Sequence, residues 1–534
     1  MRAPLDSSVT LEHERAALDR ARRATAARLA EFSRIGTGGG ADALSDEYIA
    51  AVVAGAVEKF QRELVVFGRI DDDQPWRIGL YGIHDDGEQI VVDWRAPHAQ
   101  HFYQSSFDEP GAMHRRVSYV GCIDDLFVED FESGEVSGSS PLMTELSRSR
   151  GESMRTAVAT LQADQDRLVR LDPDERLVVR GGPGTGKTVV GLHRAAWLVY
   201  HDRRLTAERI LVIGPSDRFL RYVSAVLPTL GEAKITQTTF DRLLGPSAPS
   251  GDEQEWLRQL DDFEAGLYGS GSIRVGAVRI RQQEVDELID RLRQRTLSWR
   301  DRRATFASAI ASRYELKAGD VSRAAADILP PCSAREALRR LTRTGVDGHH
   351  GAFADEVRAR FEGAPARFSH VIVDEAQDVS LLQLRAVLRR ATGVTMVGDD
   401  AQRSRRDGLG LGGVAVLLGV ETQEMVTAYR MSAEIATWLN EHAALHDLGG
   451  VVLDGIRPTG IDVGHRDDVA AADTELRSRW DTVAVIDAGD VWSHKGVEYD
   501  AVVVVTDEMT PREVYLAASR AAHELIFSSK TSQI

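Results

Sequence analysis

The sequence predicts an α/β protein with two units built on parallel sheets, preceded by a helical segment and a small β-rich domain. Two observations carry this prediction. Short apolar runs alternate with helix-like stretches between residues 177 and 506, which is the pattern of a doubly wound parallel sheet. One of these runs leads directly into the glycine-rich segment GGPGTGKT (181–188). The length of 534 residues suggests three or four domains of about 150 residues each.

The composition is that of a globular protein. Apolar residues make up 43% and charged residues 28%, which excludes a chain that is disordered throughout. The only two cysteines, Cys122 and Cys332, exclude a disulfide scaffold and favour a reducing compartment. No apolar run is long enough to span a membrane, and the N-terminus lacks the apolar core of a secretory signal. We therefore expect a cytoplasmic protein with no membrane partner.

The overall charge limits the possible partners. Lys and Arg number 65 and Asp and Glu number 82, so the formal net charge is −17. A chain this acidic does not bind polyanions over its whole surface. If nucleic acid binds, we expect it to meet a local basic patch.

Residues 1–64 are predicted to form a helical hairpin. A seven-residue repeat of mainly apolar residues runs through residues 7–35, glycines follow at 36–40, and a second apolar stripe ends at Leu64. Two helices around a glycine turn predict an antiparallel pair. A helical layer packed on a neighbouring domain is the alternative interpretation.

Residues 65–150 are predicted to form the small β-rich domain. Runs such as VVFGRI, WRIGLYGI and QIVVDW are separated by turn residues. The acidic run 71–73 is predicted to be a solvated turn.

The α/β region divides into two parts, residues 151–427 and 428–534. Its predicted strands are LVV (177–179), RILVIG (209–214), HVIVDE (370–375), VTMVG (394–398), VAVID (483–487) and AVVVVT (501–506). A mostly helical insertion at about 241–367 interrupts the first part. Residues 274–303 of that insertion carry nine arginines against five acids. This run is either a DNA or RNA contact through Arg274–Arg303, or a contact with a protein partner, or a helix face rich in salt bridges.

The segment GGPGTGKT fits the phosphate-binding pattern G-x-x-x-x-G-K-[ST]. Its glycines allow backbone N–H groups to curl around phosphate oxygens at the positive end of the next helix. Lys187 is placed to reach the β- and γ-phosphates of ATP, and the Thr188 hydroxyl to bind Mg²⁺. The predicted ATP-binding residues of this loop are Gly182, Pro183, Gly184, Thr185, Gly186, Lys187 and Thr188.

A second motif, HVIVDEAQD (370–378), ends a predicted buried strand. Asp374 is expected to share the Mg²⁺ ion with Thr188, and Glu375 to orient and deprotonate the attacking water. Both are therefore candidate catalytic residues of an ATPase.

These two motifs and four later ones resemble those of superfamily 1A helicases of the UvrD/Rep type. The resemblance covers roughly residues 160–240 and 370–530 and implies two RecA-like domains. It also implies further roles. On the adenine side, it implies recognition of the base by Gln165 or, alternatively, Gln162, and stacking on the base by Tyr429. At the γ-phosphate, it implies a sensor, Gln402, supported by Asp399, and contacts from Arg430 and Arg520. It also implies that Glu498 binds the ribose.

Within that group, the segments FGRID (67–71) and DWRAPHAQHFYQ (93–104) are similar to those of the HelD family. HelD proteins bind bacterial RNA polymerase. This resemblance implies RNA polymerase core as the partner, with the hairpin entering the secondary channel and the insertion reaching toward the primary channel.

Some positions depart from the helicase pattern. GPSDRFLRY (214–222) stands where UvrD-type enzymes contact single-stranded DNA, Trp492 replaces the usual His, and only roughly 55 residues separate Arg430 from the strand VAVID. The departures leave ATP hydrolysis intact but disfavour translocation on DNA. The leading hypothesis is an ATPase that remodels or releases RNA polymerase. The alternatives are a 3′–5′ DNA translocase in repair and a nucleotide-sensing protein without turnover.

Overall fold

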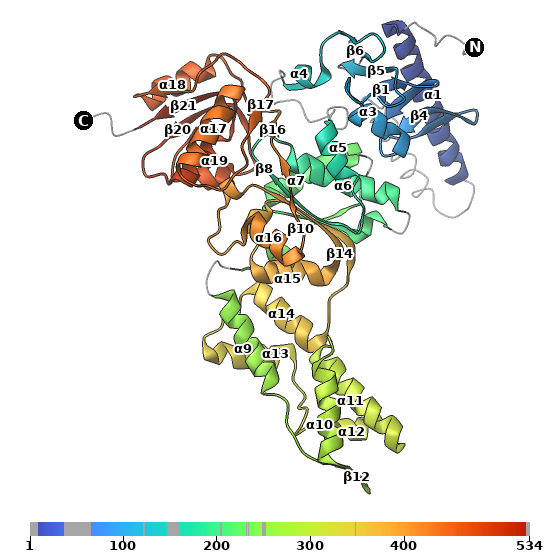
Figure 1. The fold of residues 1–534 in the computed structure, drawn as a ribbon, viewed down its shortest axis with the longest axis vertical. Coiled ribbons are helices and arrows are strands. Elements are labelled where there is room, and N and C mark those ends of the chain that lie inside the picture. Colours follow the sequence, from blue (N-terminus) through green and yellow to red (C-terminus); the bar gives the residue numbers. More distant parts are fainter. Residues whose placement is uncertain are drawn as a thin grey trace.

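The computed structural model describes residues 9–36, 66–120, 123–146, 161–202, 205–230, 232, 234–247, 252–347 and 349–529. Figure 1 shows a central α/β unit with a second α/β unit and a β-rich module above it and a helical arm below it. The α/β class and the parallel sheets predicted from the sequence are confirmed. The second helix of the predicted hairpin lies outside the described residues.

The N-terminal module is a sheet of seven strands with one long helix against it. The strand order is β3-β4-β2-β1-β5-β6-β7, and all neighbours are antiparallel except β2 and β4. Its elements are α1 (Leu11–Gly36), β1 (Val66–Asp71), β2 (Pro75–Gly79), β3 (Ile83–Asp85), β4 (Glu88–Asp93), α3 (Gln100–Gln104), β5 (Arg115–Val120), β6 (Asp125–Asp130), β7 (Glu135–Ser137) and α4 (Pro141–Leu146).

The first half of α1 is built into this module. Leu18 and Ala21 are buried against the sheet. The Glu14 carboxylate, which is fully buried, accepts hydrogen bonds from Arg69 and Arg77. A buried carboxylate needs such partners to offset its desolvation. The helix and the sheet therefore fold as one body.

The first α/β unit contains a six-stranded parallel sheet in the order β10-β9-β13-β14-β8-β15. The carboxyl ends of β8, β14 and β13 lie side by side, which is where open α/β sheets bind ligands. Its elements are α5 (Ala163–Val169), β8 (Arg176–Gly181), α6 (Lys187–His201), β9 (Ile210–Gly214), α7 (Asp217–Val226), β10 (Thr236–Thr239), β13 (Phe368–Val373), α15 (Leu381–Arg390), β14 (Ala391–Gly398), α16 (Gly410–Leu418) and β15 (Thr422–Met425).

The helical arm separates β10 from β13 in the sequence and has its own hydrophobic core, which continues into α15. In Figure 1 the hairpin of β11 and β12 lies at the far end of the arm. The elements are α8 (Phe240–Leu244), α9 (Glu253–Ala265), β11 (Ile273–Val275), β12 (Val278–Ile280), α10 (Gln282–Arg293), α11 (Trp299–Tyr314), α12 (Ala318–Ala324), α13 (Ala334–Leu341) and α14 (Gly351–Glu362).

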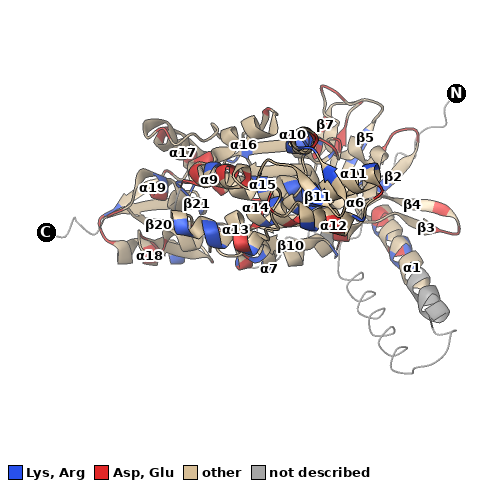
Figure 2. Ribbon diagram, turned by 90° about the horizontal axis from the view of Figure 1, so that it is seen from below, with Lys and Arg blue, Asp and Glu red and all other residues tan. Residues whose placement is uncertain are grey.

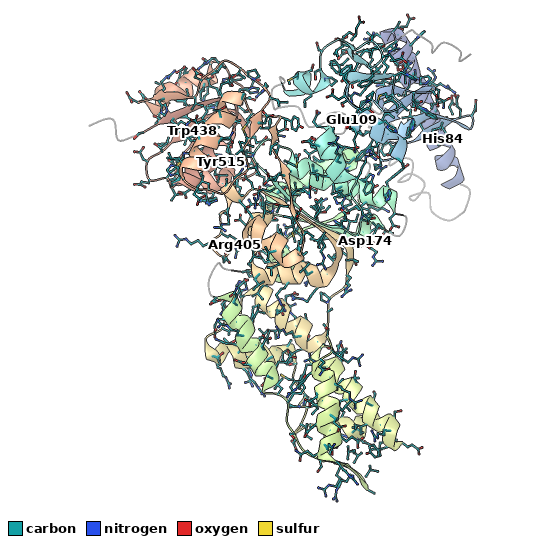
Figure 3. The ribbon with its side chains drawn as sticks, viewed as in Figure 1. His84, Glu109, Asp174, Arg405, Trp438 and Tyr515 are labelled. Carbon is teal, nitrogen blue, oxygen red and sulfur yellow. The ribbon has the colours of Figure 1, made fainter. Side chains whose placement is uncertain are left out.

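The second α/β unit has a four-stranded parallel sheet in the order β18-β21-β20-β19. Tyr515, on α19, is buried in its core, and Trp438, on α17, packs 4.5 Å from the ring of Phe527 (Figure 3). The elements are β16 (Thr427–Ala428), α17 (Ala433–Leu445), β17 (Asp454–Gly455), β18 (Gly464–Arg466), α18 (Val469–Arg477), β19 (Val483–Ile486), β20 (Tyr499–Val505), α19 (Pro511–Ala518) and β21 (Ala521–Ser528). Among the described residues, no helix has both the length and the apolar character needed to cross a membrane.

Candidate active site

The glycine-rich segment forms a loop between β8 and α6. Gly184 and Gly186 have φ angles of 75° and 87°, a left-handed conformation that favours glycine. A Cβ atom at position 186 would lie 2.4 Å from the side-chain nitrogen of Gln165. Lys187 begins α6, and its Nζ donates to the Gly182 carbonyl oxygen at 2.7 Å. The loop thus places a cation and a helix N-terminus together, the arrangement that binds phosphate.

Thr188, in the first turn of α6, contacts Asp374, which directly follows β13. The Thr188 hydroxyl donates to Asp374 Oδ2 at 2.7 Å. Burial and the neighbouring Glu375 raise the pKa of Asp374 to about 6. A hydroxyl and a carboxylate are hard oxygen donors of the kind that Mg²⁺ prefers. This pair therefore fits a Mg²⁺ ion that is also held by phosphate oxygens.

Glu375 has a strained backbone and a crowded carboxylate. Its φ angle is 55°, which is uncommon for a residue with a side chain and is often found at functional sites. Its Oε2 atom accepts from Gln377 Nε2 at 2.6 Å and lies 3.2 Å from Lys495 Nζ. Burial acts to raise the pKa of Glu375, but Lys495 and Lys187 outweigh it, so the pKa is lowered. The carboxylate therefore stays ionised, as a base must be.

Sequence reasoning missed Lys495, which comes from the second α/β unit. Besides Glu375, its Nζ contacts Asp378 Oδ2 at 2.7 Å and the Gln402 carbonyl oxygen at 3.2 Å. Burial acts to lower the pKa of Lys495, but the Glu375 and Asp378 carboxylates raise it. The lysine lies in the segment SHKGVEYD (493–500), and a cation three residues before a predicted ribose ligand was the available signal.

Gln402 and Arg520 form a second link between the two units. Arg520 Nη2 donates to Gln402 Oε1 at 2.8 Å, and Gln402 Nε2 donates to Asp399 Oδ2 at 2.9 Å. The Asp399 backbone N–H donates to Gln377 at 3.0 Å. A continuous set of hydrogen bonds thus joins Arg520 to the residues around Glu375.

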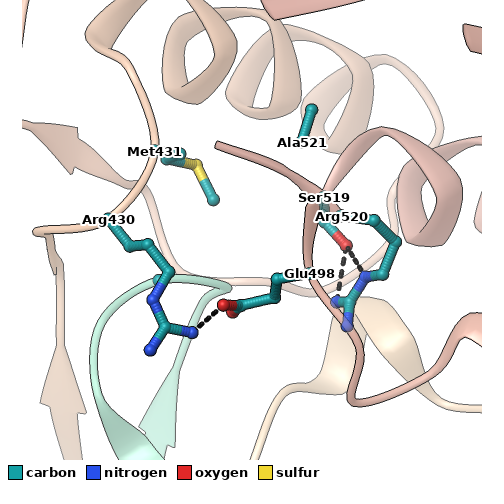
Figure 4. A pocket seen from close by; sticks show the side chains of 7 residues that line it. Arg430, Met431, Glu498, Ser519, Arg520 and Ala521 are labelled. Carbon is teal, nitrogen blue, oxygen red and sulfur yellow. Dashed lines mark hydrogen bonds and ion pairs between the residues drawn. The ribbon is translucent and has the colours of Figure 1, made fainter. Parts of the chain in front are cut away.

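A small, partly open pocket lies between the glycine-rich loop and the second unit. Figure 4 shows Arg430 and Glu498 paired at its side and Arg520 turned toward Ser519. Gly184 and Met431 complete this part of the lining. Three of the residues predicted to bind ATP from the second unit, Arg430, Glu498 and Arg520, are therefore grouped beside the loop.

Two predicted adenine-side residues lie on or near α5. Gln165 Nε2 donates to the Thr185 carbonyl oxygen at 3.0 Å, and its Oε1 accepts from the Gln162 backbone N–H at 3.0 Å. The Tyr429 hydroxyl donates to Asp164 at 2.9 Å. Gln165, rather than Gln162, therefore contacts the phosphate loop, and Tyr429 joins α5 to the second unit.

The segment DWRAP fastens the N-terminal module to the same helix. Arg170 donates to the main-chain carbonyl oxygens of residues 94, 95 and 96 at 2.8, 3.2 and 3.4 Å. Its Nε also contacts the buried Asp166 at 2.9 Å. Arg95 pairs with Asp93 and with Glu232 of the first unit, each at 2.8 Å. One hydrophobic core runs through both parts, so module and unit form a single packed body.

Two family models match parts of the chain. Residues 8–122 match the family model described as DNA helicase IV HelD, N-terminal domain, and residues 165–406 match the model described as AAA domain. No curated protein matches the chain.

Several solved structures are similar to the chain at low identity. The PRRSV helicase is 13% identical with a TM-score of 0.31, and the alignment covers 84% of this chain and 74% of that one. The arterivirus nonstructural protein 10 helicase is 12% identical with a TM-score of 0.29, covering 78% and 71%. Its complex with DNA is 11% identical with a TM-score of 0.30, covering 70% and 65%. The two family matches together support a HelD-like helicase of the UvrD/Rep type.

Proposed function

We propose that the protein hydrolyses ATP in the cytoplasm, binds bacterial RNA polymerase, and uses ATP-driven approach of its two α/β units to remodel the polymerase or release it from nucleic acid. The observation that carries the proposal is the joint between the units. Lys495 and Arg520 of the second unit contact Glu375 and Gln402 of the first, while a HelD-type module shares a hydrophobic core with the first unit.

The residues present can perform each part of ATP hydrolysis. The loop 182–188 would hold the phosphates, with Lys187 at the β- and γ-phosphates, and Thr188 and Asp374 would hold Mg²⁺, which neutralises phosphate charge when bound. Glu375 would orient the attacking water and accept its proton. Among the described residues, Glu375 Oε1 has no hydrogen-bond partner, so this oxygen can accept a proton while Oε2 stays paired.

The second unit supplies the cations that would contact the γ-phosphate. Arg430 and Arg520 would stabilise charge on the transferred group, and Gln402 would report its presence through Arg520. Glu498, paired with Arg430, would bind the ribose, while Tyr429 and Gln165 would face the base. Because these residues come from both units, ATP favours their approach and hydrolysis relaxes it.

RNA polymerase as the partner rests on the N-terminal region. Residues 8–122 match the HelD model, and an acidic chain of net charge −17 suits a competitor for channels that hold nucleic acid. A DNA translocase is the second candidate, because the matching model is described as DNA helicase IV. The short segment between Arg430 and β19 leaves little room for the large second-unit insertion of a processive helicase.

A binding assay with purified polymerase core tests the proposal. Because Glu14 is buried in the β-rich module, deleting residues 1–64 would damage the fold. We therefore replace only residues 28–64 with a glycine–serine linker and keep the packed half of α1. We expect the thermal midpoint and basal ATPase to stay near wild type while co-migration with polymerase is nearly lost.

Single-stranded DNA in the ATPase assay separates the two candidates. A polymerase-directed enzyme should show little stimulation by DNA, whereas a translocase needs it. Strong DNA stimulation together with no polymerase binding by the wild-type chain would overturn the proposal in favour of the translocase.

A further inference from the structure

The end of the helical arm carries a group of exposed arginines. The six, which we call the arm-tip arginines, are Arg274, Arg279, Arg281, Arg291, Arg293 and Arg295. They lie on the β11–β12 hairpin, on α10 and just after it. Figure 2 views the molecule from the side of this arm and shows blue segments around β11, α10 and α11. None of the six forms a salt bridge with another described residue.

Two of these arginines face each other directly. In the antiparallel hairpin Arg274 is the register partner of Arg279, and both side chains are exposed. Their neighbours Ile273 and Ile280 are also partners and are buried on the opposite face. Like charges directly opposite each other destabilise a strand pair. This hairpin keeps such a pair without a neutralising acid and is less stable for it. Departures of this kind from local stability are expected at functional sites.

Three of the four acids on α10 are engaged by other groups, and the fourth, Asp290, forms no salt bridge with a described residue. Glu284 accepts from the Tyr314 hydroxyl at 2.6 Å and pairs with Arg313. Asp286 accepts from the Ser270 hydroxyl at 2.9 Å, and Glu287 accepts from Gln283 at 3.0 Å. The interpretation of this run as a helix face rich in salt bridges is therefore wrong for the arm-tip arginines.

Other arginines of the same arm behave differently. Arg339 and Arg340 on α13 both pair with Glu336, at 3.0 and 2.7 Å, and Arg323 pairs with Asp320. Within the tip, Arg293 lies over the Tyr268 ring at 4.2 Å, Arg279 Nη2 donates to the Ser272 hydroxyl at 3.5 Å, and Arg291 Nε donates to the Glu287 carbonyl oxygen at 3.2 Å. None of these contacts supplies a negative charge. The tip thus carries six arginines without a salt bridge to a described residue, against a chain that is acidic overall. Arg335, Arg343 and Arg358, elsewhere in the arm, form none either, but they are spread over α13, the turn after it and α14.

The chemistry of the tip selects its ligand. Guanidinium groups bind phosphate oxygens through paired N–H donors. The described part of the arm exposes no large aromatic side chain, so it offers no platform for stacking unpaired bases. Phosphates in a regular double-stranded backbone fit such a surface better than a splayed single strand.

We propose that the arm-tip arginines bind the phosphate backbone of duplex DNA without reading its sequence. The site lies at the far end of the arm from the glycine-rich loop (Figure 1). Binding therefore requires no nucleotide, and the proposal stands apart from ATP hydrolysis. The tip holds DNA while the two α/β units act elsewhere.

The experiment measures fluorescence anisotropy of a labelled 20-base-pair duplex with the full chain over a range of salt concentrations. The test variant carries Arg274→Gln, Arg279→Gln and Arg281→Gln. The control carries Arg323→Gln, Arg339→Gln and Arg340→Gln, which remove the same charge from the same arm at paired positions. Thermal midpoints and basal ATPase of both variants should equal those of wild type.

We expect the test variant to bind the duplex at least about tenfold more weakly at low salt. The slope of log K against log salt concentration should decrease by the amount that corresponds to the loss of roughly two to three phosphate contacts. The control should bind like wild type. A single strand of the same length should bind wild type more weakly than the duplex. Equal binding by test and control variants, a preference for the single strand, or no saturable binding by wild type would each overturn the proposal.

Discussion

Lys495 Nζ lies 3.2 Å from Glu375 Oε2, and this contact joins the second α/β unit to the base proposed for ATP hydrolysis. The same Nζ donates to Asp378 at 2.7 Å. Both partners are largely buried, so the pair is screened little by solvent. The position of the second unit therefore acts directly on the charge and orientation of Glu375.

Removing the Lys495 ammonium should slow turnover more than it weakens binding. We expect Lys495→Met to lower kcat for ATP at least about tenfold with a small change in KM, because the pair orients the base rather than the nucleotide. Lys495→Arg should restore part of the rate. Lys234→Met, at an exposed lysine of the first unit, is the control and should be silent. A Lys495→Met enzyme with normal kcat would contradict the positioning role.

Variants of Lys187 and Glu375 should affect ATP binding and ATP hydrolysis separately. Lys187→Ala removes the loop cation and should weaken ATP binding. Glu375→Gln keeps the shape of the side chain but not its basicity, and should bind ATP while turning over at least about a hundredfold slower. Equilibrium nucleotide binding and steady-state ATPase measured on both variants check this. Unchanged turnover in Glu375→Gln would remove it as the base.

Domain closure should depend on the γ-phosphate. We expect residues 428–534 to resist protease better with a non-hydrolysable ATP analogue than with ADP, because Arg430 and Arg520 gain a partner only with the former. Arg430→Ala should lose this difference. Arg466→Ala, at an exposed salt bridge of the second unit, should retain it. Equal protection by both nucleotides in wild type would argue against the clamp.

The joint between the arm and the first unit should be sensitive to acid. Glu356, on α14, is buried and paired with Arg385 at 2.7 Å and with Arg360 at 3.0 Å. Burial acts to raise the pKa of Glu356, but the arginines outweigh it and lower the pKa to about 2. A carboxylate with a depressed pKa contributes its full stability to the fold at pH values above 4.5, the ordinary pKa of the group. That stability is lost as pH falls from there toward about 2.

Glu356→Gln should therefore cost about 3 kcal/mol of stability at neutral pH and much less below pH 3. Thermal midpoints of wild type and variant over this pH range measure the effect. Glu336→Gln is the matched control, since the pKa of Glu336 is also lowered to about 2 but its carboxylate is partly exposed. A pH-independent loss in Glu356→Gln would point to packing rather than charge.

Local sequence patterns were sufficient for the parallel sheets and the phosphate loop. Apolar runs such as 394–398 are strands because both faces of a parallel sheet are covered. The edge strand β10 (TQTT) and the short β15 (TQEM) carry no such run, and both were missed for that reason. The acidic run 71–73 shows a related failure. Asp71 is buried and pairs with Arg69 on the same strand and with Arg115 of β5 at 3.6 Å. The second partner arrives through strand pairing, which no local pattern reveals.

The candidate site also contains residues that local motifs predict and contacts that they do not. Motif spacing could place Thr188, Asp374 and Glu375 because parallel strands end at one edge. It could not find that Lys495 reaches across from another unit, since that contact depends on how two sheets pack. Nor could it find that Arg170 clamps the DWRAP segment, because the two are joined only through main-chain oxygens.

The Arg170 clamp has a consequence for how the protein tolerates mutation. A guanidinium that grips three carbonyl oxygens recognises a shape of the backbone, which nearly any sequence can present. This contact places no constraint on the identity of the side chains at positions 94–96, whose limits come from Trp94 packing on His193 and from Arg95 pairing. Arg170 itself has no substitute that can span the same oxygens. Variation in a saturation library should therefore be sparse at position 170, although that position belongs to none of the nucleotide-binding motifs.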